Sequence, residues 1–305
     1  MKAPEALHVL VLTFNEERHI GRCLASVAEA ATTITVIDSG STDRTVEIAA
    51  AQGARVIEHP WVNHAAQMNH AIDSVAGRGG WLMRIDADEV LEEGAAARLR
   101  PFLVAQDEAV AGIAVRRRMV FMGRRIRFGG MEPSWQLRLL RNGRGRCEQR
   151  WMDEHFVTDG EVVRSPFVIT DINLKPITQW VNKHNDYASR EALELLNVAH
   201  GLYAEERAQA DGTSPGAAFK RFVKTKIYSR LPGGGRSTLY FLARYFLLLG
   251  FLDGKEGFYF HSMQAFWYRT LVDAKVTEIE RYAATHNVPL ADAVKACTGL
   301  DITQS

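Results

Sequence analysis

The sequence contains only three cysteines, Cys23, Cys147 and Cys297, and no two of them lie close together in the chain. An odd number of widely separated cysteines argues against a disulfide framework or a zinc site and favours reduced thiols in a cytosolic setting. No uninterrupted apolar segment is long enough to span a bilayer, and the first residues lack the long apolar core of a signal peptide. These absences predict a cytoplasmic location.

Net charge is also nearly absent, because 37 Lys and Arg residues oppose 36 Asp and Glu residues. Nothing global therefore indicates a nucleic-acid partner. A Gly-rich dinucleotide fingerprint is missing too, since Asp38-Ser39-Gly40-Ser41 does not have the G-x-G-x-x-G spacing. One absence is local: residues 217–252 contain no acidic residue.

What is present is a rhythm of short apolar runs and helical segments in the first half of the chain. Residues 8–12, 34–37, 55–57 and 81–85 have the character of strands, and helical segments separate them. Alternation of this kind predicts an α/β fold with a mostly parallel sheet and flanking helices. In such sheets, ligands bind outside the carboxyl ends of the strands.

Polar residues stand at three of these predicted strand ends. Asn15 and Glu16 follow the first strand, Asp38 ends the second, and Asp86 and Asp88 follow the fourth. Because the carboxyl ends of parallel strands meet at one edge, we expect these side chains to line the same edge of the sheet.

The stretch Asp86-Ala87-Asp88-Glu89 places three carboxylates within four residues. Clustered anions repel one another unless a cation lies between them, and hard oxygen ligands suit Mg2+ or Mn2+. The structural alternative is a strand end followed by an Asp N-cap, for a helix that Glu92 and Glu93 begin.

The pattern changes after a helix predicted near residues 93–106. Residues 111–121 and 124–128 are predicted to be strands around a Met122-Gly123 turn, and residues 135–140 another strand. Their arginines form either a solvated face or part of a diphosphate site. From Pro176 onward the pattern is mostly helical, which divides the chain into residues 1–175 and 176–305.

Residues 239–252 are almost entirely apolar and follow a basic, aromatic-rich segment. As one helix they would extend about 21 Å, short of the roughly 30 Å that a bilayer core requires. The segment is therefore predicted to be either a buried core helix or an interfacial one. The basic residues of this region are Lys220, Arg221, Lys224, Lys226, Arg230, Arg236 and Arg244.

Three motifs in order, Thr13-Phe14-Asn15-Glu16, Asp38-Ser39-Gly40-Ser41-Thr42-Asp43 and Asp86-Ala87-Asp88-Glu89, resemble those of family 2 glycosyltransferases with a GT-A fold. Later stretches resemble the narrower branch of lipopolysaccharide-core glycosyltransferases. These are Gln67-Met68-Asn69, Gly129-Gly130 through Pro133 to Arg138, Asp153-Glu154, and Phe251-Leu252-Asp253-Gly254 with Gly257-Phe258.

The resemblance implies a Rossmann-like GT-A catalytic domain in residues 1–175 and an acceptor or membrane-interface part in residues 176–305. It implies that Asp38 accepts from a uracil-like base, that Asp86 faces the ribose, and that Asp88 holds Mg2+ or Mn2+ on the diphosphate of a UDP-sugar. The implied nucleotide-sugar-binding residues are Thr13, Asn15, Glu16, Asp38, Gln67 and Asp86. Gln67 and Asn69 are equally well explained as ordinary turn residues.

Enzymes of this family invert the configuration at the anomeric carbon of the sugar, so the resemblance implies that a carboxylate deprotonates the acceptor hydroxyl. Asp153-Glu154 falls where the branch has a His-Glu pair, but here Asp replaces the His and His155 follows. We expect Glu154 to be the base, with Asp153 as the alternative and His155 as an added metal ligand or a structural residue.

The leading hypothesis is an inverting glycosyltransferase that moves a sugar to a glycan or lipid-linked acceptor in cell-surface polysaccharide biosynthesis. A sugar nucleotidyltransferase and a catalytically decayed nucleotide-sugar-binding or membrane-associated protein are the alternatives. The basic, aromatic segment 217–252 leads us to expect peripheral attachment to the cytoplasmic face of the inner membrane.

Overall fold

The computed structural model describes residues 5–148, 156–203 and 234–301. The chain divides into two compact units. Of the described residues, the sheet unit comprises 5–127, 131–148 and 156–175, and the helical unit comprises 128–130, 176–203 and 234–301.

The sheet unit is built on a nine-stranded mixed sheet, in the order β3-β2-β1-β4-β8-β6-β11-β5, with β7 paired to β6. The parallel part consists of β3 (Arg55–Glu58), β2 (Thr33–Asp38), β1 (Leu7–Thr13) and β4 (Trp81–Arg84). The other part mixes directions, with β8 (Ser134–Arg141) antiparallel to both β4 and β6 (Val110–Phe121). β11 (Glu161–Ile172) is parallel to β6, and β5 (Glu89–Leu91) is antiparallel to β11. A small second sheet pairs β9 (Gly145–Cys147) with β10 (Phe156–Thr158).

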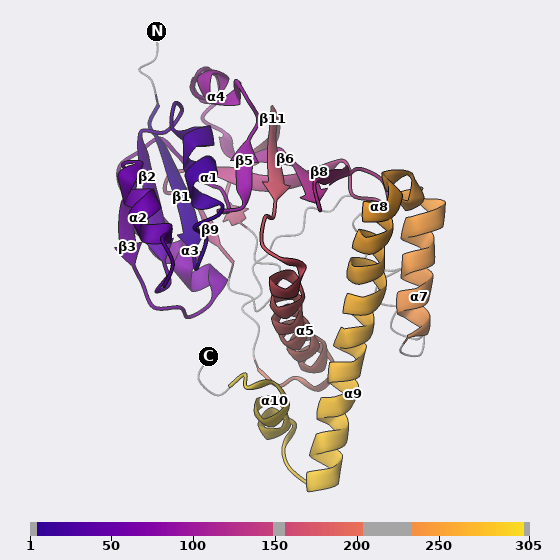
Figure 1. The fold of residues 1–305 in the computed structure, drawn as a ribbon. Coiled ribbons are helices and arrows are strands. Elements are labelled where there is room, and N and C mark those ends of the chain that lie inside the picture. The colour runs from indigo at the N-terminus through magenta and orange to yellow at the C-terminus, as the bar shows by residue number, and fades with distance from the viewer. Residues whose placement is uncertain (1–4, 149–155, 204–233, 302–305) are drawn as a thin grey trace. The chain divides into compact units, whose positions relative to one another are not determined.

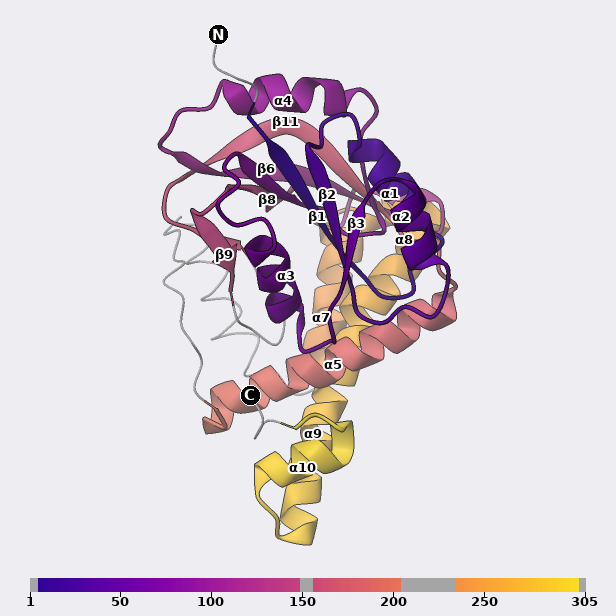
Figure 2. The same cartoon turned by 90° about the vertical axis from the view of Figure 1, so that its left-hand side faces the viewer.

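Helices cover both faces of the sheet because side chains of a strand alternate between them. Leu7, Val9 and Val11 point into a core under α1 (Ile20–Val27), α2 (Thr45–Ala51) and α4 (Ala95–Val104). Leu10 of the same strand packs on the opposite face, beneath α3 (His64–Asp73). Figure 2 shows α4 and α3 on opposite sides of the sheet.

Most predicted elements of the sheet unit are confirmed, but two findings differ. The predicted helix start at Glu92 is wrong, because Glu89–Leu91 forms β5 and α4 begins only after Gly94, whose φ is 69°. The sequence pattern also gave no indication of β11, which is a 12-residue strand. The Met122-Gly123 turn between β6 and β7 (Arg124–Ile126) is confirmed, with φ values of 50° and 80°.

The helical unit contains α5 (Ile177–His200), α7 (Gly235–Leu242), α8 (Gly254–His261), α9 (Tyr268–His286) and α10 (Leu290–Thr298). α8 continues through the π-helical segment η5 (Ser262–Trp267) into α9. α5 packs against α9, and α9 against α10, which buries Leu193, Leu196 and Ile279 (Figure 1). The predicted single helix over residues 239–252 is wrong. α7 passes into the π-helical turn η3 (Ala243–Leu247), and a break at Leu249 precedes the 3-10 turn η4 (Gly250–Asp253).

No helix in the described ranges is long and apolar enough to cross a membrane. The three cysteines are free thiols.

Candidate functional site

The polar strand ends lie together at one edge of the parallel half of the sheet, as the sequence predicted. Thr13 of β1 is in register with Asp38 of β2, and Leu10 is in register with Arg84 of β4. The next residue after β4 continues this pairing, since the amide of Ile85 donates to the carbonyl of Leu10 at 3.2 Å. The segments after β1, β2 and β4 therefore leave the sheet side by side.

Asp38 is almost completely buried and organises the turn that follows β2. Its carboxylate accepts hydrogen bonds from the Thr13 hydroxyl at 2.8 Å and from the amides of Gly40 and Ser41 at 3.0 and 2.7 Å. The Ser41 hydroxyl adds a fourth at 2.6 Å. The chain itself thus engages both oxygens of Asp38, and a base bound there would share or replace one of these donors. Its contact with a base stays a prediction.

Asn15 stands in the left-handed region with a φ of 54°, which few residues other than glycine adopt. Its side-chain oxygen accepts from the backbone amide of Thr42 at 2.8 Å, and its backbone amide donates to the Ser41 hydroxyl at 2.8 Å. These two bonds join the segment after β1 to the turn after β2. Asn15 therefore shapes the sheet edge by holding two neighbouring loops together.

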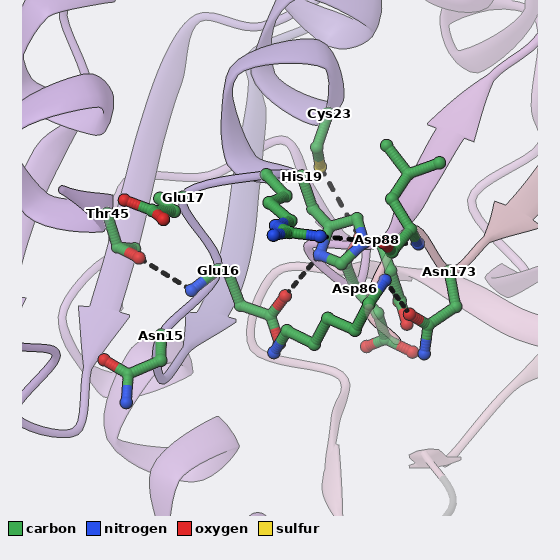
Figure 3. Close-up of polar contacts among 12 residues, drawn as sticks. Asn15, Glu16, Glu17, His19, Cys23, Thr45, Asp86, Asp88 and Asn173 are labelled. Atoms are coloured by element: carbon green, nitrogen blue, oxygen red, sulfur yellow. Dashed lines mark hydrogen bonds and ion pairs between the residues drawn. The ribbon is translucent and has the colours of Figure 1, made fainter. Parts of the chain in front are cut away.

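Glu16 is the centre of a small ionic cluster (Figure 3). Its carboxylate accepts from Nδ1 of His19 at 2.6 Å and from Nζ of Lys175 at 2.7 Å. Nε2 of the fully buried His19 accepts from the amide of Leu174 at 2.8 Å, so the ring is neutral with its proton on Nδ1. Burial alone would raise the pKa of Glu16, but the hydrogen bonds from His19 and Lys175 outweigh it and lower that pKa.

The Asp86–Glu89 stretch is held by a buried ionic network rather than by a helix start. Glu89 is fully buried and accepts from the amide of Asp86 at 3.0 Å. Arg138 of β8 donates to Glu89 and, at 3.2 Å, to Asp86, while Arg117 of β6 lies 3.3 Å from Glu89. The arginines of β6 and β8 are thus partly explained as partners of this stretch, not as a solvated face.

Burial would raise the pKa of Asp86, but Arg138 and then Arg84 hold it well below its usual range. Asp86 is therefore an acceptor with a fixed negative charge. Burial raises the pKa of Glu89 to about 7, since Arg138 and Arg117 only partly offset that effect and the charge of Asp86 adds to it.

Asp88 differs from its neighbours. Its backbone carbonyl accepts from the amide of Ile172 at 2.9 Å and from Arg22 at 3.2 Å, so its position is fixed. Its partly exposed side chain has no hydrogen bond or ion pair to any residue in the described ranges. Burial and then the charge of Asp88 raise the pKa of the nearby Asp171 to about 6, while Arg117 acts in the opposite direction. The N-cap alternative for Asp88 is wrong, because a strand follows it.

A divalent cation fits these residues. The carboxylate of Asp88, which has no partner in the described ranges, lies near the carboxyl group of Asp171. Carboxyl oxygens of this kind are suitable hard ligands for Mg2+ or Mn2+. Within the described ranges, however, no group of three or more His, Cys, Asp and Glu side chains is placed to hold a metal. A cation at Asp88 would therefore take its other ligands from a phosphate-bearing substrate and water.

Gln67 is buried and fully occupied by neighbouring groups. Its side chain donates to Ser39 at 3.0 Å and to the carbonyl of His59 at 3.0 Å, and its oxygen lies 2.6 Å from Nδ1 of His59. Asn69 makes two 2.9 Å hydrogen bonds with the backbone of Cys147. Both amides connect α3 to neighbouring loops, and a nucleotide contact from Gln67 stays a prediction.

Asp153, Glu154 and His155 lie outside the described residues, so the position of the acceptor base stays a prediction as well. The site also contains residues that the sequence analysis missed, namely His19, Arg22, Arg117, Asp171 and Lys175. Glu89, which the sequence analysis counted in the acidic stretch, is a buried partner of Arg138. Arg117 carried a detectable signal, since it belongs to three successive arginines within an otherwise apolar strand. Lys175 and His19 carried none, because their partners are known only from the fold.

Comparison with known proteins identifies a protein family whose profile this chain matches. Residues 8–157 match the profile of glycosyl transferase family 2. The lipopolysaccharide core biosynthesis glycosyltransferase LpsC of Rhizobium meliloti is 32% identical over 162 residues, which cover 51% of this chain and 58% of LpsC. An uncharacterized glycosyltransferase of Rickettsia bellii is 37% identical over 87 residues, or 28% of this chain and 29% of that protein. The chain thus spans less than two thirds of the length of these relatives.

Among solved structures, glucosyl-3-phosphoglycerate synthase from Mycobacterium tuberculosis, in complex with Mn2+, UDP and glucosyl-3-phosphoglycerate, is 24% identical. The match covers 38% of this chain and 46% of that chain, with a TM-score of 0.32. A similarity this low supports no assignment of metal, donor or acceptor to this chain.

Proposed function

Because this chain belongs to glycosyl transferase family 2, we propose that it is a metal-dependent, inverting transferase of a sugar from a nucleotide-sugar donor, a UDP-sugar, to a glycan or lipid-linked acceptor. The observation that carries the proposal is the sheet edge, where three strand ends bring an amide and four carboxyl groups together and leave only Asp88 among them unpartnered within the described ranges.

The residues of the edge divide the work of donor binding in this proposal. Asp86 has a fixed charge and a fixed position, which suits it to accept from the hydroxyls of a ribose. Asp38 and Asn15 shape the loops on which a base would lie. Asp88 would hold Mg2+ or Mn2+, whose positive charge stabilises the leaving diphosphate.

Lys175 adds a cation at the same edge, 2.7 Å from Glu16. Glu16 is held ionised, so it orients the ammonium group without giving up its own hydrogen bond to His19. A general base is still required to take the proton of the acceptor hydroxyl, and Glu154 is our candidate, with Asp153 as the alternative.

The similarity to LpsC over half of this chain supports a place in lipopolysaccharide core biosynthesis. We propose in addition, from the basic and aromatic segment 217–252, that the protein attaches peripherally to the inner membrane. The basic residues that motivate attachment, Lys220, Arg221, Lys224 and Lys226, lie outside the described residues. Their contribution therefore depends on sequence alone, as an attraction of about 1 kcal/mol per cation to anionic lipid.

The test is a panel of nucleotide sugars, scored by thermal unfolding with and without Mn2+. A donor at about 100 times its dissociation constant should stabilise the fold by roughly 2.7 kcal/mol, and only when the metal is present. UDP release in the presence of a lipopolysaccharide acceptor then measures transfer. Stabilisation without any turnover over a range of acceptors would instead support a nucleotide-sugar-binding protein that has lost catalysis.

A further inference from the structure

The helical unit exposes an unusual number of large apolar side chains in one turn. Residues 246–252, here called the apolar turn, connect η3 to α8. Six of their seven side chains are exposed, Leu247 by 79%, and only Gly250 is buried. Scattered exposed leucines are ordinary, but a consecutive run marks a surface that contacts something apolar.

The turn lies at the end of a helical hairpin. α7 packs against η5 and α8 against η3, so the two helical segments run side by side and the turn joins them (Figure 1). Leu239 and Leu242 of α7 and Phe258 and Tyr259 of α8 are also exposed. The apolar surface therefore continues from the turn onto both arms of the hairpin.

The backbone of the turn is fixed from inside. Leu249 has a φ of 60°, a left-handed conformation that costs free energy in any residue with a Cβ. The carbonyl of Leu248 accepts from the amide of Gly129 at 2.8 Å, and Nε of Arg244 donates to the carbonyl of Gly129 at 2.8 Å. Asp253 accepts from the amide of Phe128 at 2.9 Å.

The result is an inverted distribution of polarity. Arg244 and Asp253, the charged residues that flank the turn, are buried, whereas the leucines between them face outward. His261 packs so closely on Gly129 and Gly250 that a Cβ at either position would overlap its ring. Such a turn holds its leucines outward before any partner arrives, because buried charges and close packing over-determine its strained backbone.

We propose that the apolar turn inserts into the acyl boundary of an anionic lipid bilayer and so anchors the protein to one leaflet without spanning it. Charge selects a lipid surface over a second protein copy. In sequence, residues 217–252 contain seven basic residues and no acidic one; Arg236 among them pairs with Asp273 and Arg244 is buried, and the exposed Lys255 follows the turn. An apolar surface that is next in sequence to a basic segment is typical of an interfacial anchor. This inference rests on the proposed function, which includes peripheral attachment to a membrane, and adds the structural element that inserts.

The experiment measures co-flotation of the full chain with phosphatidylglycerol–phosphatidylcholine vesicles at 0.1 M and 1 M salt. At high salt the attraction of cations is screened and the contribution of apolar insertion remains, so wild-type protein should still bind. The double variant Leu247→Ser/Leu248→Ser should lower the partition coefficient at 1 M salt by at least about tenfold. The matched control is Leu195→Ser/Val198→Ser, which removes two exposed apolar side chains of α5. It should change binding less than about twofold.

A second measurement does not depend on loss of binding. A Leu247→Cys variant in a Cys297→Ser background can carry an environment-sensitive fluorophore, because Cys23 and Cys147 are buried. Its emission should shift to the blue when vesicles are added, and a label at Val198→Cys should not respond.

Three results would overturn the proposal. Wild-type protein that does not float with anionic vesicles has no anchor, and equal binding by the Leu247/Leu248 variant places the anchor elsewhere. A wild-type dimer that this variant converts to monomers, without loss of vesicle binding, would make the turn an interface between copies. Donor-induced stabilisation measured on the same proteins separates these results from failure of the proposed transferase activity, since it should be equal in all variants.

Discussion

The sheet unit and the helical unit treat polar and apolar side chains in opposite ways. In the sheet unit, the apolar side chains fill two cores and the charged ones gather at the carboxyl ends of β1, β2 and β4, where each except Asp88 has a partner in the described ranges. In the helical unit, Arg244, Asp253 and His261 are buried while six side chains of the apolar turn are exposed. We propose that the polar surface of the sheet unit binds a polar ligand and that the apolar turn of the helical unit binds an apolar partner.

Both units nevertheless fix their surface with a non-glycine residue in the left-handed conformation. Asn15 offsets the cost through its own side chain, which accepts from the amide of Thr42. Leu249 has no polar side chain, so the offset comes from its surroundings, through Gly129 and Arg244. Asn15 and Leu249 thus lie at the two surfaces for which we propose a function, whereas Met122 and Asn287 adopt positive φ in the turn between β6 and β7 and after α9.

The largest expected effect concerns sugar transfer, which we propose for the sheet unit. Removing a general base typically lowers the rate 10²- to 10⁴-fold. Glu154→Gln should therefore reduce transfer by about this factor, with donor-induced stabilisation and vesicle binding unchanged, in an assay of UDP release. If Asp153→Asn has this phenotype and Glu154→Gln does not, Asp153 is the base.

The next prediction concerns the buried network beneath Asp86. Arg138→Met leaves Glu89 buried without its main partner, and breaking a buried ion pair from one side costs about 3–5 kcal/mol. Urea unfolding should show this loss. The control Arg146→Met removes an exposed pair with Asp73 and should cost less than about 1 kcal/mol. Equal losses in both variants would show that Arg138 does not hold the acidic stretch.

A third prediction addresses the metal. Asp88→Asn preserves size but removes the charge of the carboxylate that, among the described residues of this sheet edge, lacks a partner, so metal-dependent donor binding should fall about 10²-fold or more while the melting temperature without ligand stays near wild type. Asp107→Asn, which changes an exposed carboxylate elsewhere, serves as the control. Wild-type affinity for UDP and Mn2+ in Asp88→Asn would remove Asp88 from the metal site.

The smallest expected effect belongs to the helical unit. Burial and then the charge of Arg244 lower the pKa of His261 to about 4. Below about pH 6.5 the unfolded chain binds a proton that the folded chain does not. The free energy of unfolding therefore decreases as the pH is lowered from about 6.5 to about 4. At pH 5.5 the loss from His261 is about 1.4 kcal/mol.

Urea unfolding at pH 7.5 and 5.5 measures this loss. His261→Leu should reduce the difference between the two pH values by about that amount, whereas His286→Leu, at an exposed position, should keep the wild-type difference. An unchanged difference in His261→Leu would show that this histidine is protonated in the folded protein.

The sequence by itself determined the strands of the parallel half and the polar residues that end them. Each of these is a local pattern, a short apolar run and the first polar residue after it, and parallel strands must end at one edge. The Met122-Gly123 turn could also be predicted from a local sequence pattern, and both residues adopt positive φ in the structure. For the same reason Asp38, Asp86 and Asp88 could be predicted to lie together before the fold was known.

Tertiary structure alone decided the rest. Glu89–Leu91 forms β5 because it pairs with residues 169–171 of β11. Since a strand and not a helix follows Asp88, the carboxylate of Asp88 does not cap a helix. Glu16 meets Lys175 from 159 positions away. In the helical unit, an apolar run that would form one helix breaks at Leu249, where the amide of Gly129 donates to the carbonyl of Leu248 and Arg244 in turn donates to the carbonyl of Gly129. A pairing between distant residues leaves no periodicity in the chain, so only the folded contacts could show it.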